Sequence, residues 1–484
     1  MDIVNSTLFG QQRAVGVGFH NIGSGLLRAS HEATVRKVQR HYGERCGHLP
    51  LNAVKVRVLV DDCTDDIQTQ MAYLSRLLGK DILPLTHNEL VQLQRDTSGI
   101  RPLVVPYINV PETETYVQQE LDADVWGLPG KMTHILKNKA SFYQLVDELA
   151  LPGFQTPDYR IASIYDLPAI ALDFLSTVED MYQAADMAHD YPPGVMLRAA
   201  ESDGNYGCCL LYEQEGRIVI IPNGEADHTL YYRLWSEALP AAQQHLLSTM
   251  NVQKETRVVI SRYIDFVDSP GLSVVIMDGQ VASLRWNGQL QLDGSKACVG
   301  TSTYVPRSEA FRHLQQLYEE PTAAFLETLL RKTAERCHID FTTIRGVANL
   351  DIMLPGILEQ RLQRQRKLPL VNYLAECNPR WTNYTDAIMV MLGVTKREPT
   401  IANMRAVIQE GISTIDKYPL PERLDPYLLR EWVFERDAAL QYEGIRIICR
   451  MTKNPMGLIF AGDVQRAQRE FEQVVSMLST KVTS

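Results

Sequence analysis

Leu374–Arg380 reads LAECNPR, and the fold of this 484-residue chain is best inferred from this stretch. Upstream, Ala348–Met353 reads ANLDIM, in which Asp351 stands between Leu350 and Ile352. Short, mainly apolar runs of this kind predict buried β-strands. Because side chains alternate between the two faces of a strand, we expect Asp351 to point away from the face of Leu350 and Ile352.

Two polar residues of the first stretch share one strand face. Glu376 and Asn378 are two positions apart, so both project from the same side. Two oxygen donors on one strand, with the Asp351 carboxylate on a neighbouring strand, fit a hard cation such as Mg²⁺. A buried pair of carboxylates is costly unless a metal or another cation offsets the charge. The alternative is that the two carboxylates pair with nearby arginines at a sheet edge, and the spacing alone leaves both interpretations open.

Cations and a glycine-containing loop lie upstream of these strands. Arg198–Gly207 reads RAAESDGNYG, a strand that ends in a cation and runs into a polar loop able to expose backbone N–H groups. Lys139 stands where a helix is predicted to begin, and helix N-termini attract anions. Taken singly, the loop is equally consistent with an ordinary hairpin, and the lysine with a solvated surface residue.

In their order along the chain, these elements resemble the ATP-grasp superfamily over roughly residues 130–390. The segments that carry the resemblance are NKASFYQLVDELALPGFQTP, GVMLRAAESDGNYG, TRVVISRYID, IRGVANLDIML and LAECNPRWTN. The resemblance implies that ATP lies between two α+β subdomains and that one or two Mg²⁺ ions, for which Mn²⁺ can substitute, bridge its phosphates. The preceding residues look like the α/β domain found before this core in peptide and amide ligases.

The resemblance also implies roles for individual residues. The metal ligands would be Asp351, Glu376 and Asn378, and the phosphate-binding cations Lys139 and Arg198. The loop over the phosphates would contain Glu201, Ser202, Gly204 and Gly207. The segment Val259–Ile264 would line the adenine, through Ser261, Arg262, Tyr263 and Ile264. Arg380 would face the reacting carboxylate or phosphoryl group.

The chain departs from the family pattern at several of these positions. Arg198 stands where lysine is usual, and Ser261 where many members have a glutamate at or next to this position. The glutamate expected for the ribose is missing, and Asp265 or Asp268 is the candidate replacement. Asn349 stands where many dipeptide ligases carry an arginine that stabilises the tetrahedral intermediate, a role that Arg285 or Arg380 would then take.

The reaction implied by the resemblance is ATP-dependent joining of a carboxylate to an amine. The carboxylate attacks the γ-phosphate to form an acylphosphate, the amine captures it, and ADP and phosphate leave, in biosynthesis of a small natural product or peptide. The expected partners are small-molecule carboxylate and amine substrates, with an acceptor that is free or carrier-bound, and a homodimer. The alternatives are a kinase of the same fold that phosphorylates a small molecule, and a non-catalytic nucleotide-binding module.

Composition excludes several other classes of protein. There are 48 Lys and Arg residues against 58 Asp and Glu residues, a net charge of −10, which argues against a general nucleic-acid binder. No apolar stretch reaches the roughly 18–20 residues needed to span a bilayer. The eight cysteines are scattered without C-x-x-C pairs, as expected for reduced thiols. A multi-domain enzyme of the cytoplasm is the expectation.

Three regions are expected along the chain: an α/β domain at 1–125, an ATP-grasp core at 126–385 and a helical segment packed on that core at 386–484. In the first, strands at 54–60 and 103–108 flank an amphipathic helix, and the Gly-rich stretch Gly16–Gly25 is either a phosphate loop or closely packed backbone. In the core, Asp278–Gly279 predicts a hairpin turn, Pro321 the start of a helix, and Gly356–Lys367 a polar loop.

Overall fold

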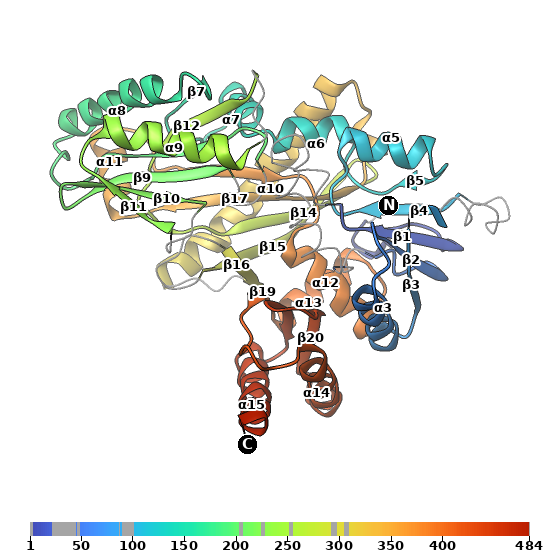
Figure 1. Ribbon diagram of the computed structural model, residues 1–484. Coiled ribbons are helices and arrows are strands. Elements are labelled where there is room, and N and C mark those ends of the chain that lie inside the picture. Colours follow the sequence, from blue (N-terminus) through green and yellow to red (C-terminus); the bar gives the residue numbers. More distant parts are fainter. Residues whose placement is uncertain are drawn as a thin grey trace.

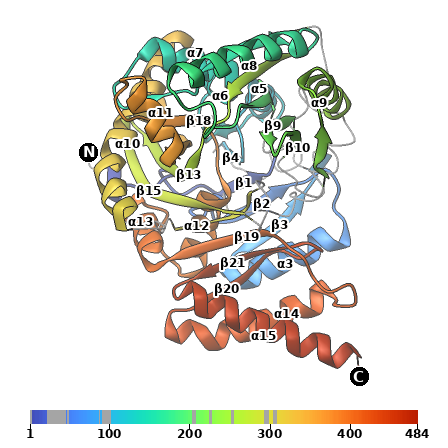
Figure 2. The same cartoon turned by 90° about the vertical axis from the view of Figure 1, so that its left-hand side faces the viewer.

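The computed structural model describes residues 3–21, 45, 49–86, 88–89, 101–202, 207–223, 228–250, 255–291, 298–303 and 309–483. Within these ranges the chain forms three sheets flanked by helices (Figures 1 and 2). The first is a parallel sheet with helices, and the other two combine mainly antiparallel strands with helices. The expected fold class, an α/β region followed by α+β regions, is confirmed.

The first sheet is parallel throughout, with strands in the order β3-β2-β1-β4-β5. Its elements are β1 (Val15–Phe19), β2 (Lys55–Leu59), α3 (Asp65–Leu78), β3 (Asp81–Leu85), β4 (Leu103–Pro106), α5 (Pro111–Gln119) and β5 (Asp124–Val125). Gly16 lies inside β1, where a Cβ would come within 2.3 Å of Pro50 Cγ. The start of the Gly-rich stretch is therefore closely packed strand and not a phosphate loop, while residues 22–25 lie outside the described residues.

The second sheet has the order β11-β10-β9-β8-β12-β7, and helices α8 and α9 cover one of its faces (Figure 1). Its elements are β7 (Tyr159–Ser163), α8 (Leu167–Ala184), β8 (Gly194–Ala199), β9 (Cys208–Gln214), β10 (Arg217–Pro222), β11 (Leu230–Tyr232), α9 (Trp235–Thr249) and β12 (Arg257–Arg262). Val195, Leu197 and Ile260 pack under the two helices. Alternation then leaves Arg198 and Ser261 on the opposite face, because Arg198 pairs with Val259 and Ser261 with Met196 across the strands.

The third sheet has ten strands and carries the metal-ligand candidates. Its order is β20-β21-β19-β16-β15-β14-β17-β18-β6, with β13 paired to β17. The strands are β6 (Phe154–Gln155), β13 (Phe266–Asp268), β14 (Gly271–Met277), β15 (Gln280–Gln291), β16 (Cys298–Thr303), β17 (Gly346–Pro355), β18 (Asn372–Asn378), β19 (Ile412–Tyr418), β20 (Arg446–Met451) and β21 (Met456–Ala461). Leu272, Leu350 and Ile352 pack against helices α6 (Gly130–Lys137), α7 (Lys139–Leu149) and α10 (Glu309–Cys337) on one face.

Two expectations for this core are wrong. Helix α10 begins at Glu309 and continues through Pro321, because the residues before the proline also favour a helix. Residues 357–365 form helix α11 (Ile357–Gln365) and not a loop. That helix is stabilised by tertiary contacts: Leu362 packs under the second sheet, and Glu359 is fully buried. The turn at Asp278–Gly279 is confirmed, since both residues have positive φ and Met277 pairs with Gln280.

The C-terminal region contains the expected helices and also three strands that were not expected. Its helices are α12 (Asn383–Val394), α13 (Ile401–Glu410), α14 (Pro426–Leu440) and α15 (Val464–Thr483). Strands β19 to β21 extend the third sheet through the pairing of β19 with β16, and Figure 2 shows them between the rest of the molecule and α14 and α15. The region also shares one hydrophobic core with the N-terminal domain, through residues such as Met71, Leu74 and Ile448. Among the described helices, none is long and apolar enough to cross a membrane.

Candidate active site

The three proposed metal ligands converge on one face of two neighbouring strands. Asp351 in β17 is paired in register with Glu376 in β18. The Asn378 amide donates to Asp351 Oδ2 at 2.9 Å and to Glu376 Oε1 at 3.3 Å. Leu350 and Cys377 point to the opposite, apolar face, as alternation predicted. Strand β17 lies inside the sheet between β14 and β18, whereas β6 pairs with β18 only at Asn372 and Tyr373.

Two cations approach this carboxylate pair from other elements. Lys139 is the first residue of α7, a helix capped by the Asn138 side chain, which accepts from Ser141 N at 3.0 Å. Its Nζ lies 3.6 Å from Glu376 Oε2 and donates to the Ser202 carbonyl at 2.7 Å. Only 4% of Lys139 is exposed, so the interpretation as a solvated surface lysine is wrong.

Arg198 reaches the same strand from the second sheet. Its guanidinium donates to the Ala375 carbonyl at 2.9 Å and to the Tyr143 hydroxyl, and it lies over the Tyr143 ring. Tyr143 was not among the predicted site residues, although its position four residues after Lys139 places both on one face of the helix. Lys139 from α7 and Arg198 from β8 therefore bring positive charge to one pair of carboxylates.

The pKa values of the two carboxyl groups are shifted in opposite directions. Burial and the charge of Glu376 raise the pKa of Asp351 to about 7, against hydrogen bonds from Asn349 and Asn378. Burial opposes ionisation of Glu376 as well, but attraction from Lys139, Arg198 and Arg380 outweighs it and lowers the pKa of Glu376. A divalent cation would relieve the repulsion that raises the pKa of Asp351, and carboxylate and amide oxygens are the donors that Mg²⁺ prefers. The described residues hold no group of three His, Cys, Asp or Glu side chains suited to a metal, so such an ion would need phosphate or water ligands as well.

A row of neutral polar side chains binds Oδ1 of Asp351, the oxygen that Asn378 does not contact. Asn349 Nδ2 donates to Asp351 Oδ1 at 2.7 Å, and Asn349 Oδ1 accepts from Ser273 Oγ at 3.0 Å and from Asn287 Nδ2 at 2.9 Å. Gly271 leaves room for this row, because a Cβ there would lie 2.8 Å from an oxygen of each of Asn287, Asn349 and Asp351. Asn349 thus orients Asp351. Ser273 was not predicted, although alternation along β14 places it on the face opposite Leu272 and Val274.

The described part of the glycine-containing loop folds back over Lys139. Ser202 is buried, its Oγ donates to the Ala199 carbonyl at 2.8 Å, and its own carbonyl accepts from Lys139. Gly207 has φ +72° at the start of β9. Glu201 is half-buried beside Ser202, and Gly204 lies outside the described residues. The loop ends therefore flank the lysine that the resemblance places at the phosphates.

The segment expected to line the adenine divides between two faces. Ser261 shares the face of Arg198, whereas Arg262 points the other way and is bound by Glu359 at 2.7 and 2.9 Å. The Arg262 guanidinium is thus held in a buried ion pair away from the face of Arg198, so a contact of Arg262 with the adenine would come from its backbone. The Tyr263 ring stacks on Tyr212 at 5.8 Å, and Ile264 is buried.

The two candidates for the ribose, Asp265 and Asp268, are both half-buried and differ in their contacts. Asp265 Oδ2 accepts from the Leu358 backbone N–H at 2.9 Å at the start of α11, so this carboxylate serves to cap a helix. Asp268 lies in β13, and its Oδ1 accepts from the neighbouring Ser269 N–H at 3.0 Å. It is only half-buried, which leaves it accessible to a ligand.

The two arginines expected to be catalytic lie in different surroundings. Arg380 donates to the Tyr107 hydroxyl at 3.2 Å, and its charge acts on both carboxylates. Tyr107 directly follows β4 of the first sheet, and ligands commonly bind at the carboxyl ends of parallel strands. This position could have identified Tyr107 from the sequence as a residue near the site. Arg285 is exposed with φ +70° at an irregularity of β15, and none of the described contacts joins it to the carboxylates. The next residue, Trp286, packs in the apolar core.

Solved structures of other enzymes align along most of this chain at low identity. An N5-carboxyaminoimidazole synthase from Aspergillus clavatus, in complex with ADP and 5-aminoimidazole ribonucleotide, is 13% identical with a TM-score of 0.49 over 98% of this chain and 99% of that one. A phosphoribosylamine–glycine ligase from Thermotoga maritima is 11% identical, with a TM-score of 0.45 over 96% of each chain. No family model and no curated protein matches the sequence.

Proposed function

We propose that this chain is an ATP-grasp enzyme that joins a carboxylate to an amine at the expense of ATP. The observation that carries the proposal is the convergence of Asp351, Glu376 and Asn378 with Lys139 and Arg198, which come from different sheets and helices. Two carboxylates beside two cations suit a metal-bound polyphosphate, because phosphoryl transfer requires charge neutralisation and alignment more than a dedicated base.

The chain's own residues have distinct parts in this proposal. Asp351, Glu376 and Asn378 would hold Mg²⁺, which supplies charge neutralisation at the phosphates. Lys139 and Arg198 would bind phosphate oxygens, and Arg198 offers a planar fork where a lysine would offer a point charge. Ser261, Tyr263 and Ile264 would lie along the base, and Asp268 would bind the ribose.

Arg380 would stabilise negative charge at the reacting group. The incoming carboxylate would displace ADP by attacking the γ-phosphorus, and the acylphosphate formed would lose phosphate when the amine attacks its carbonyl carbon. The proton lost by the amine would pass to phosphate or solvent. The acid, the amine and any carrier of the acceptor belong to the proposal only as chemical classes.

A matrix of amino acids and amines tests this function. Phosphate release should require both a carboxylate and an amine, and the product mass should equal their sum less one water. A phosphorylated product formed with a single hydroxyl compound would instead support a kinase. ATP binding without turnover across the whole matrix would support a non-catalytic module.

Arg380→Lys should lower kcat by about 10-fold or more while leaving the affinity for ATP nearly unchanged. Lysine keeps the charge but loses the fork that can contact two oxygens of the reacting group. Initial rates over a range of ATP concentrations, together with calorimetric ATP binding, give kcat and affinity separately. An effect confined to ATP affinity would place Arg380 at the nucleotide and not at the reacting group. Arg361→Lys is the matched control, because Arg361 lies on α11 and forms an exposed ion pair with Asp190.

A further inference from the structure

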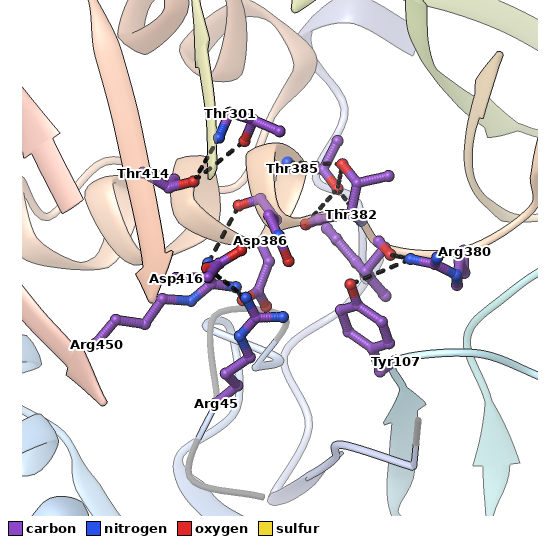
Figure 3. A network of polar contacts seen from close by, with 12 residues as sticks. Arg45, Tyr107, Thr301, Arg380, Thr382, Thr385, Asp386, Thr414, Asp416 and Arg450 are labelled. Atoms are coloured by element: carbon purple, nitrogen blue, oxygen red, sulfur yellow. Dashed lines mark hydrogen bonds and ion pairs between the residues drawn. The ribbon is translucent and has the colours of Figure 1, made fainter. Parts of the chain in front are cut away.

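A buried cluster of charged side chains lies beside the start of α12 (Figure 3). Arg45 and Arg450 pair with Asp416 and Asp386, and the exposed fractions of the four side chains are 2%, 2%, 5% and 0%. Arg45 comes from the N-terminal domain, Asp386 from α12, and Asp416 and Arg450 from β19 and β20. Burial of four charges is costly even when they are paired, and hydrophobic residues of similar size would often stabilise a fold as well. A cluster that contributes so little to stability for its cost is a candidate for a role beyond stability.

The cluster is joined to the loop that carries Arg380. Asn383, the first residue of α12, donates its side-chain amide to Asp416, and its carbonyl accepts from Arg450 Nη1 at 3.4 Å. Asp386, one turn further along α12, pairs with Arg450. Thr382 caps the helix through reciprocal bonds with Thr385. The start of α12 is thus bound to β19 and β20 only three residues after Arg380.

The other end of the same loop is the metal-ligand strand. Glu376 and Asn378 lie in β18, and Arg380 follows after Pro379. On its N-terminal-domain side, Arg380 contacts the Tyr107 hydroxyl at 3.2 Å. The segment between β18 and α12 is therefore held at one end by sheet pairing and at the other by the charged cluster, so the backbone that aims Arg380 depends on both.

We infer that Asn383, Asp416 and Arg450 are positioning residues for Arg380, which they hold toward the carboxylate pair by anchoring the start of α12. This inference rests on the proposed function, because it takes Arg380 to act at the reacting group. It adds that three parts of the chain together position Arg380. The first contributes Tyr107 and Arg45, the second contributes β18 and α12, and the last contributes β19 and β20. A misplacement of about 1 Å by distant residues can cost on the order of 100-fold in rate.

Asn383→Ala tests the inference without removing a buried charge. It deletes the bond to Asp416 and leaves the identities of Glu376, Asn378 and Arg380 unchanged. We expect kcat to fall about 10-fold, as for other residues that orient a functional group from behind, with ATP affinity unchanged. We also expect faster hydrogen exchange at the amides of residues 380–386 in the free protein. Thr414→Val is the matched control, because Thr414 is buried in the same strand as Asp416 and loses hydrogen bonds only to Thr301.

A double-mutant cycle separates positioning from general stability. In an Arg380→Lys background, the loss caused by Asn383→Ala should shrink to less than about 2-fold, because the group being aimed is already impaired. Equal losses in both backgrounds, or equal losses for Thr414→Val, would overturn the inference. Unchanged hydrogen exchange in residues 380–386 would overturn it as well. Hydrogen exchange is measured without substrates, so it tests the anchoring of the loop independently of activity. Absence of ligase activity in the unmodified protein would count against the proposed function alone.

Discussion

Glu376→Gln should reduce ATP turnover by more than about 100-fold while the protein remains folded. Replacement of residues that merely orient metal ligands commonly costs 10–100-fold, so loss of a ligand's charge should cost at least that. The substitution keeps the shape of the side chain, but Lys139, Arg198 and Arg380 lose the carboxylate that they stabilise. Phosphate release at saturating ATP and Mg²⁺ measures the loss.

ATP binding is a second measurement for this variant, and here the substitution should not weaken the measured property. Without Mg²⁺, the variant should bind ATP at least as well as the unmodified protein, because one negative charge no longer repels the triphosphate. Added Mg²⁺ should then tighten ATP binding less in the variant. Glu335→Gln is the control, since it removes one carboxylate from an exposed ion pair with Lys332 on helix α10. Normal turnover in Glu376→Gln would remove Glu376 from the metal site.

The arrangement of the carboxylates could be predicted because it depends on strand periodicity. Alternation assigned Glu376 and Asn378 to one face of their strand and turned Asp351 away from Leu350 and Ile352, and the structure pairs Asp351 with Glu376 across the two strands. The start of a helix at Lys139 followed in the same way from local pattern. Both features are decided by neighbours within a few residues along the chain, so the sequence carries them directly.

Features that depend on contacts between distant residues could not be predicted. The burial of Arg262 is set by Glu359, nearly one hundred residues away, on a helix that the sequence suggested was a loop. Strands β19 to β21 are stabilised by addition to a sheet begun far upstream. The side chains of Arg45 and Asp416 are separated by 371 residues, and no local pattern relates them. Arg285 was placed by its charge alone, and an irregularity of β15 leaves it exposed.

Glu359→Gln should lower the free energy of unfolding by about 3–5 kcal/mol, the usual cost of leaving a buried charge without its partner. Glu359 accepts from Arg262 at 2.7 and 2.9 Å and from the hydroxyls of Tyr191 and Tyr373 at 2.7 and 2.6 Å. A glutamine has one acceptor oxygen and cannot serve all four donors. Asp158, whose side chain is 40% exposed, would be the carboxylate left to offset the charge of Arg262. Urea denaturation followed by circular dichroism measures the change.

The dependence of this loss on pH follows from the direction in which the carboxyl group is shifted. Burial disfavours the charged form of Glu359, but hydrogen bonds and attraction from Arg262 outweigh it, so its pKa lies below the ordinary value. A lowered pKa in the folded state contributes stability that is present above the unfolded pKa, about 4.3, and is lost as the pH falls through the folded value. The unmodified protein should therefore lose part of its advantage over Glu359→Gln below about pH 4. Arg361→Gln, two residues along the same helix at an exposed pair with Asp190, should change stability by less than about 1 kcal/mol. If both variants had equally small effects at neutral pH, the buried pair would not stabilise the junction of α11 with β12.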